Sequence, residues 1–180
     1  MSGHIVVIVN PTKLADLDEV RVDLERVVAA RGRDLVVVET TEEDPGFGQT
    51  RAAVDQGADV VCALGGDGTV RAVAQVLAGT GIPLGLLPSG TGNLLARNLG
   101  TPRSSVEEAL IAVIDGVDTV IDIGWLELGA DAAREGSSGE EASGIPNAGS
   151  GTVHAFTVMA GLGFDARIMD DAPEGVKDKV

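Results

Sequence analysis

The chain has 180 residues, with 13 lysines and arginines against 28 aspartates and glutamates, and so a formal net charge of −15. That charge argues against nucleic-acid binding, which needs a basic surface. With 44% hydrophobic residues the chain is too apolar to be disordered, yet no apolar run reaches the roughly 18 residues of a membrane span. One cysteine, Cys62, and no signal-peptide pattern predict a cytoplasmic protein without internal disulfides.

Strands and helices are predicted to alternate over the first 116 residues. Short aliphatic runs predict buried strands at 5–9, 35–38, 60–64 and 82–87. Apolar side chains at helical spacing predict helices at 17–28, 45–57, 70–77, 94–99 and 109–114. Ser104 or Ser105, with Glu107 or Glu108, predicts a capping box before the last helix. The alternation favours an α/β fold with a parallel sheet.

The pattern changes after Gly116. Residues 117–128 are expected to be extended, and residues 152–160 alternate like a second strand. Between them, 129–151 contains six glycines and four serines among 23 residues, which predicts a loop. Two strands joined by a polar loop predict an antiparallel hairpin. We therefore expect an α/β ATP-binding domain at 1–116 and part of an antiparallel β domain at 117–180.

The segment Gly65-Gly66-Asp67-Gly68-Thr69 follows the third predicted strand. In open α/β sheets ligands bind outside the carboxyl ends of strands. Glycines allow close backbone approach, and the N–H groups at the start of a helix suit phosphate. Asp67 would repel phosphate unless Mg²⁺ came with it, and Thr69 could donate a hydrogen bond. The alternative is a plain strand-to-helix turn with a solvated Asp67.

A second glycine-rich segment, Leu87-Pro88-Ser89-Gly90-Thr91-Gly92-Asn93, follows the next strand. Two such turns after consecutive strands could line one crevice. Neither turn has the lysine of a Walker A motif or the spacing GxGxxG, so neither a P-loop nor a dinucleotide fingerprint is indicated.

Four segments together resemble the diacylglycerol kinase catalytic-domain family, especially its soluble bacterial lipid kinases. They are Val9-Asn10-Pro11, Gly65 to Thr69, Leu87 to Leu99 and Gly161 to Ala166. The similarity runs from about His4 to the end of the chain, in the family's order. The sequence GGDGT alone also occurs in NAD kinases, whereas LPSGTGN with GFDA is more specific to lipid kinases.

The resemblance implies an α/β nucleotide domain followed by an antiparallel β-sandwich, with the active site between them. It implies transfer of the γ-phosphoryl of ATP to the hydroxyl of diacylglycerol or a related lipid, giving phosphatidic acid. The expected partners are Mg²⁺, ATP and a lipid at a membrane surface, where a cytoplasmic enzyme would associate peripherally; a homodimer is left open. The alternatives are a NAD kinase and a non-catalytic nucleotide-binding fragment.

The resemblance also implies roles for individual residues. Those implied to bind ATP are Asn10, Thr40 or its neighbour Thr41, Gly65, Gly66, Asp67, Gly68, Thr69, Ser89, Gly90, Thr91 and Asn93. Asp67 and Asp122 are implied to serve the metal, with Asp67 the one residue assigned to catalysis. Asp165 belongs to the shared GFDA segment without an assigned role. Lys13, Arg71 and Arg97 are candidates to offset phosphate charge, although solvated surface charges are the more frequent case.

Three departures from the family pattern bear on function. Arg71-Ala72 and Asn93-Leu94 stand where many relatives have Asn-Glu and Asn-Asp, and we expect these changes to alter lipid choice more than reaction type. The family's β domain continues well over a hundred residues beyond the point that corresponds to Val180, and contains the general base. The chain is therefore expected to be C-terminally truncated, and its activity alone is left open. His154 and Cys62 are expected to be ordinary packed residues.

Overall fold

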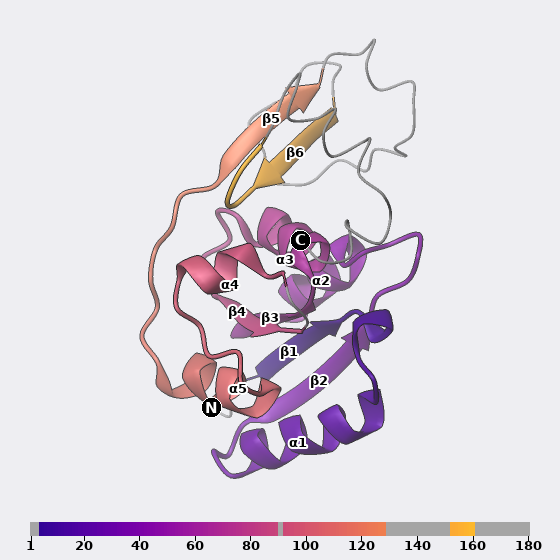
Figure 1. The fold of residues 1–180 in the computed structure, drawn as a ribbon, viewed down its shortest axis with the longest axis vertical. Coiled ribbons are helices and arrows are strands. Elements are labelled where there is room, and N and C mark those ends of the chain that lie inside the picture. The colour runs from indigo at the N-terminus through magenta and orange to yellow at the C-terminus, as the bar shows by residue number, and fades with distance from the viewer. Residues whose placement is uncertain (1–3, 90–91, 129–151, 161–180) are drawn as a thin grey trace.

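The computed structural model describes residues 4–89, 92–128 and 152–160 (Figure 1). A four-stranded parallel sheet has the order β2-β1-β3-β4, and a separate antiparallel pair joins β5 to β6. The strands are β1 His4–Val9, β2 Asp34–Glu39, β3 Val60–Gly65, β4 Leu84–Pro88, β5 Gly124–Leu128 and β6 Thr152–Phe156. The α/β fold, the parallel sheet and the antiparallel hairpin predicted from sequence are all confirmed.

The helices follow the strands in the predicted alternation. They are the 3₁₀ turn η1 Pro11–Lys13, α1 Leu17–Ala29, α2 Phe47–Asp55, α3 Asp67–Leu77, α4 Leu94–Asn98 and α5 Val106–Asp115. Side-chain caps fix where several begin, because the first N–H groups of a helix lack partners within the helix. Asp16 Oδ1 accepts from the Glu19 N–H at 3.0 Å, and Ser105 Oγ accepts from the Glu108 N–H at 3.1 Å. Of the two predicted serine caps, Ser105 is therefore the one used.

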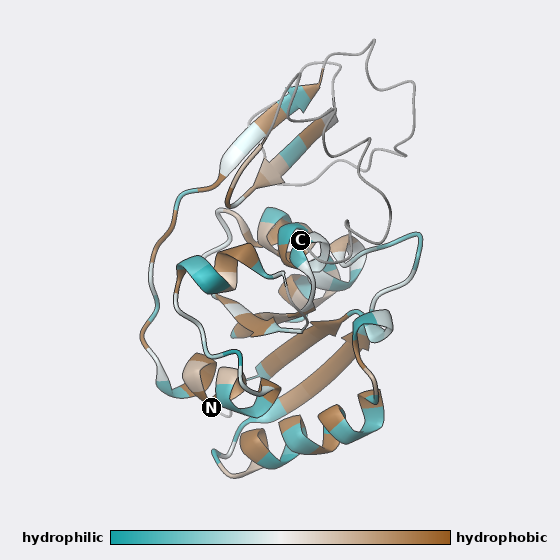
Figure 2. Ribbon diagram, in the orientation of Figure 1, coloured by the Kyte–Doolittle hydropathy of each residue, from teal (hydrophilic) through white to brown (hydrophobic). Residues whose placement is uncertain are grey.

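The central strands β1 and β3 are buried on both faces, and the sheet is hydrophobic in Figure 2. Alternate residues of β1 point to opposite sides of the sheet, with Val6 and Ile8 in a cluster with α2 and α3, and Val7 in a cluster with α1 and α5. Cys62 lies in the second cluster, where complete burial raises the pKa of its thiol to about 12. The thiol therefore stays protonated at neutral pH, in agreement with its predicted place in the core.

The segment between α5 and β5 differs from the expectation. Only Gly124–Leu128 forms a strand, whereas residues 117–123 have no strand partner, and Val117 and Val120 are 95% and 96% exposed. The segment runs as an unpaired coil, and β pairing begins only where β6 lies opposite. The predicted loop at 129–151 lies outside the described residues. Within the part of the chain that the structure describes, none of the helices has the length and apolar character needed to cross a membrane.

Candidate phosphate-binding site

The carboxyl ends of all four parallel strands meet at one edge of the sheet (Figure 1). Asn10 follows β1, Thr40 follows β2, Gly66 follows β3 and Ser89 follows β4. Backbone hydrogen bonds hold these ends together: Asn10 N–H donates to Leu64 O at 2.9 Å, and Thr40 N–H donates to Val9 O at 2.8 Å. Candidate residues from four separate segments of the sequence therefore lie at one edge.

The Asp67 carboxylate joins the two glycine-rich turns. Its Oδ2 accepts from the Asn93 N–H at 3.1 Å and its Oδ1 accepts from the Leu94 N–H at 2.8 Å. Asp67 thus begins α3 and at the same time caps α4. Hydrogen bonds to a carboxylate are about twice as strong as those between neutral groups. The predicted convergence of the two turns is therefore maintained by a side chain of one turn and two backbone donors of the other.

Asn93 holds the second turn in an unusual conformation. Its φ of 54° makes it the one described non-glycine residue with positive φ, a region that asparagine tolerates better than most residues. Its Nδ2 donates to Ser89 O at 3.1 Å, and the residue is 1% exposed. Its Oδ1 is buried and has no hydrogen-bond partner among the described residues. An acceptor buried in this way can receive a hydrogen bond from a ligand or from water.

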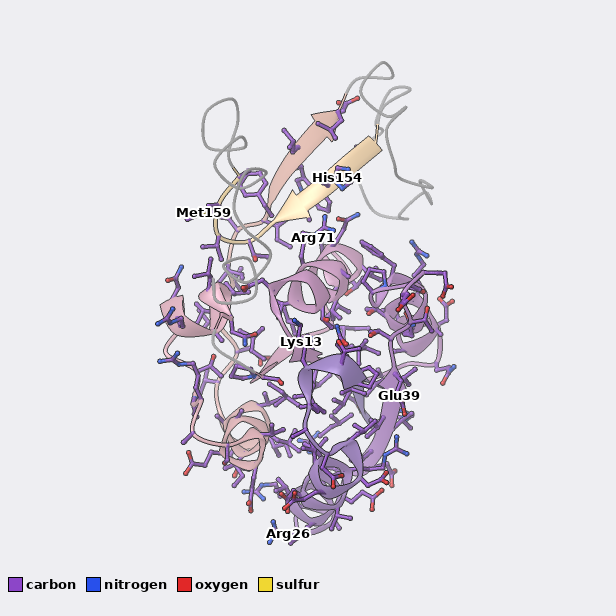
Figure 3. All side chains as sticks on the ribbon, turned by 45° about the vertical axis from the view of Figure 1, so that its right-hand side comes forward. Lys13, Arg26, Glu39, Arg71, His154 and Met159 are labelled. Carbon is purple, nitrogen blue, oxygen red and sulfur yellow. The ribbon has the colours of Figure 1, made fainter. Side chains whose placement is uncertain are left out.

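A third loop, formed by η1, packs against the second turn. Ser89 Oγ donates to Lys13 O at 2.8 Å, while Asn10 Oδ1 accepts from the Thr12 N–H at 3.1 Å and from Thr12 Oγ1 at 2.8 Å. Lys13, labelled in Figure 3, is exposed, and no carboxylate of the described residues is within ion-pair distance of it. A cation that has no ion pair among the described residues therefore lies beside the turns.

The glycines of the first turn have different surroundings. A Cβ on Gly65 would lie 2.7 Å from Thr69 Oγ1 and 3.3 Å from Asn10 Cβ, so packing of the chain itself requires glycine there. A Cβ on Gly66 or Gly68 would meet no atom of the described residues within 4 Å. Neither residue has positive φ. The chain's own packing therefore leaves space beside the start of α3, where a ligand could approach the backbone.

The donor set fits Mg²⁺ that arrives with phosphate better than a metal cage formed by protein alone. Among the described residues no group of three or more His, Cys, Asp or Glu could hold a metal ion. Asp67 supplies one carboxylate, and each of its oxygens retains lone-pair capacity beyond its one N–H partner. Mg²⁺ usually keeps several waters and binds one or two carboxylates plus substrate phosphates. Buried Thr69 adds a hydroxyl near the same turn.

The other candidate residues lie less centrally. Thr40 is buried, whereas Thr41 Oγ1 accepts from the Asp44 N–H at 3.1 Å and so shapes the turn before α2. Asp122 is exposed in the segment between α5 and β5, and no hydrogen bond connects it to the described residues of the joined turns. Gly90, Thr91 and Asp165 lie outside the described residues.

The β5–β6 hairpin packs on α3 next to the site (Figure 3). Gln75 Oε1 accepts from the buried Ala155 N–H at 3.0 Å, and Arg71 Nη1 lies 3.5 Å from His154 Nδ1. Burial, followed by the positive charge of Arg71, lowers the pKa of His154. Sequence reasoning did not connect Arg71 with His154, because a separation of 83 residues leaves no periodic signal.

Comparison with known proteins gives consistent matches. The family model described as the diacylglycerol kinase catalytic domain matches residues 4–126. A diacylglycerol kinase of Mycobacterium tuberculosis is 42% identical over 97 residues, which cover 54% of this chain and 31% of that protein. A Pseudomonas aeruginosa protein named "Probable lipid kinase YegS-like" is 38% identical over 123 residues, covering 66% of this chain and 39% of that protein.

A solved structure is similar as well. The crystal structure of a diacylglycerol kinase from Bacillus anthracis str. Sterne matches with a TM-score of 0.56 and 29% identity, covering 68% of this chain and 47% of that one. The chain spans about a third of the length of the curated relatives it matches.

Proposed function

The chain belongs to the diacylglycerol kinase catalytic domain family, and we propose on that basis that it supplies the ATP-binding half of a lipid kinase. The proposed reaction transfers the γ-phosphoryl of Mg²⁺–ATP to the hydroxyl of diacylglycerol or a related lipid and gives phosphatidic acid. Phosphoryl transfer depends on positioning and charge neutralisation more than on a covalent nucleophile. The geometry offers residues for both tasks.

One observation carries the proposal: Asp67 joins two glycine-rich turns at the carboxyl edge of a parallel sheet, and open space adjoins Gly66 and Gly68. We assign phosphate binding to the backbone N–H groups at the start of α3, to Thr69 and to Ser89, together with Gly90 and Thr91 of the second turn. Asn10 and Thr40 border the same edge and would contact the rest of the nucleotide.

The metal would be held between the phosphates and Asp67. A bound Mg²⁺ would neutralise charge on the phosphates, and the free lone pairs of Asp67 would orient it. The two N–H donors fix the direction of the carboxylate before any ligand arrives. Asp122 is exposed and lies on a separate segment. We therefore propose that it would contact waters bound to the metal, not the metal itself.

The acceptor would approach from the hairpin side of α3. We propose that residues 1–116 form the nucleotide domain and that 117–180 begin the β domain of the family. α5 ends at Asp115, and every described strand after it is antiparallel, which supports this boundary. A cytoplasmic enzyme that meets its lipid at a membrane surface fits the proposal, and the net charge of −15 would oppose broad adsorption to anionic lipid.

A phosphorylation assay on the chain tests this function against its alternatives. With γ-labelled ATP and Mg²⁺, any label that is transferred should enter diacylglycerol or a sphingosine-like lipid rather than NAD. Labelled NADP with unlabelled lipid would contradict the proposal and favour a NAD kinase. Calorimetric binding of Mg²⁺–ATP without transfer to any acceptor would instead identify a nucleotide-binding fragment.

A further inference from the structure

We propose that Arg71 and His154 together form a subsite for a phosphate group at the junction of α3 and β6, next to the glycine-rich turns. The inference rests on the proposed function, because it extends the phosphate site toward the place where the acceptor would bind. The ligand chemistry is a terminal phosphate with a double negative charge. Its source is either the γ-phosphate of the nucleotide or a phosphate carried by a lipid.

The position of Arg71 on α3 supports this subsite. Arg71 lies one helical turn after Asp67, so the two side chains project from the same helix face. In the described structure the guanidinium lies beside His154 on β6, and side chains on a helix in general lean toward its N-terminus. At a rise of 1.5 Å per residue the two Cα atoms lie about 6 Å apart along the axis. An arginine side chain is long enough to cover that distance and reach a phosphate beside Gly68.

The charge around Arg71 points to an anionic ligand. Three other arginines, Arg21, Arg26 and Arg31, each pair with a carboxylate. Arg71 is half-buried, and no carboxylate among the described residues is within ion-pair distance of it. A partly buried guanidinium without an anionic partner is costly. Although the chain has 28 acidic residues, the polar side chain that Arg71 contacts among the described residues is the ring of His154.

His154 completes the subsite as a second potential donor. Its Nδ1 lies 3.5 Å from Arg71 Nη1, and burial together with the positive charge of Arg71 lowers the pKa of the ring. On β5 the residue opposite His154 is Leu126, while Glu127 lies opposite Val153 and is exposed. On α3 the side-chain oxygen of the neighbouring Gln75 accepts the hydrogen bond of the Ala155 N–H. Arg71 is therefore the charged group that faces the ring, and a bound phosphate would reverse the local field and favour the imidazolium.

Nuclear magnetic resonance titration of the two histidines tests the subsite directly. The probe is pyrophosphate, and His4 at the opposite edge of the sheet is the internal reference. We expect pyrophosphate to raise the pKa of His154 by about half a pH unit or more, while the resonances of His4 keep their positions when pyrophosphate is added at constant pH. Arg71→Gln should raise the pKa of His154 in the free protein and reduce its response at least twofold. Arg103→Gln, at an exposed arginine that forms no ion pair with the described residues, is the matched control.

Further ligands identify the source of the phosphate. A response to Mg²⁺–ATP that is absent with Mg²⁺–ADP identifies the γ-phosphate. A response to short-chain phosphatidic acid without nucleotide identifies a lipid phosphate. No change at His154 with pyrophosphate, ATP or phosphatidic acid would overturn the subsite. If Mg²⁺–ATP shifts the amide signals of Gly66 and Gly68 but does not change the signals of His154, the proposed function stays intact. If the amide signals of Gly66 and Gly68 do not shift either, that result counts against nucleotide binding itself.

Discussion

At the scale of single residues, Gly65, Gly66 and Gly68 are glycines for different physical reasons. Gly65 leaves room for Thr69 and Asn10, which lie where its side chain would be. At Gly66 and Gly68 a side chain would enter open space, so the absence of a side chain matters only once a ligand approaches. The sequence motif predicts a glycine-rich turn but does not distinguish these two requirements, because the distinction depends on neighbours from β1 and α3.

Alanine substitutions separate the two requirements. Gly65→Ala should lower the free energy of unfolding by about 1–3 kcal/mol because the methyl group meets Thr69. Gly68→Ala, within α3, should leave stability unchanged or raise it by up to about 1 kcal/mol and yet weaken Mg²⁺–ATP binding. Urea unfolding and calorimetry on both variants measure the two effects. Equal ATP affinity in Gly68→Ala and the parent would mean that no ligand occupies that space.

Asp67 provides a second test at this scale, because it contacts the second turn and is also the proposed metal ligand. Asp67→Asn keeps one acceptor oxygen but loses the charge, so one of the two N–H groups of Asn93 and Leu94 should lose its partner. We expect a loss of about 1–3 kcal/mol in stability and loss of Mg²⁺-dependent ATP binding. Asp118→Asn, on an exposed carboxylate to which no role at the site is assigned, is the control for charge alone. Unchanged Mg²⁺ dependence in Asp67→Asn would remove Asp67 from the metal site.

At the scale of elements, the helices and strands of the α/β layer follow from the sequence pattern to within a few residues. The buried runs of β1 and β3 and the caps of α1 and α5 are local signals. The attachment of the β5–β6 hairpin to α3 is not local. It depends on Gln75 and Arg71. The spacing of residues along the helix predicts only that these two side chains lie on a partly polar face. Their partners on β6 could be found only from the folded chain.

Hydrogen exchange tests how the hairpin is attached. Gln75→Leu removes the acceptor for the buried Ala155 N–H, and an unpaired buried donor costs about 1–3 kcal/mol. The Ala155 amide should therefore exchange at least tenfold faster, while core amides of β1 and β3 keep their rates. Gln75→Glu retains an acceptor oxygen, so the Ala155 amide should exchange more slowly in this variant than in Gln75→Leu. Equal exchange in all three proteins would show that the hairpin is held by other contacts.

At the scale of the whole molecule, the net charge of −15 and a phosphate ligand are compatible only if positive charge accompanies the ligand. Composition alone disfavours nucleic acid and leaves open what else the chain binds. The four sequence segments predicted the family correctly, since their order is a property of the chain. The Asp67 bridge and the contact of Arg71 with His154 could not be predicted, because each depends on side-chain geometry between elements.

Removing the metal should therefore have a large effect. Without Mg²⁺, ATP with four negative charges would approach an acidic protein, and affinity should fall at least tenfold and become more sensitive to salt, which screens this repulsion. Calorimetry with and without a chelator, at two salt concentrations, measures this. A control with adenosine, which carries no phosphate, should show no metal dependence. ATP affinity that is unchanged by chelation would contradict a metal-assisted site.

The central claim is that two glycine-rich turns, joined by Asp67, form one phosphate-binding site. Titration of the ¹⁵N-labelled chain with Mg²⁺–ATP tests it most directly. We predict that the amide signals of Gly66, Gly68 and Asn93 shift together, with one dissociation constant, and that those of α1 do not. Shifts confined to one turn, or no shift at either turn at millimolar nucleotide, would contradict the account.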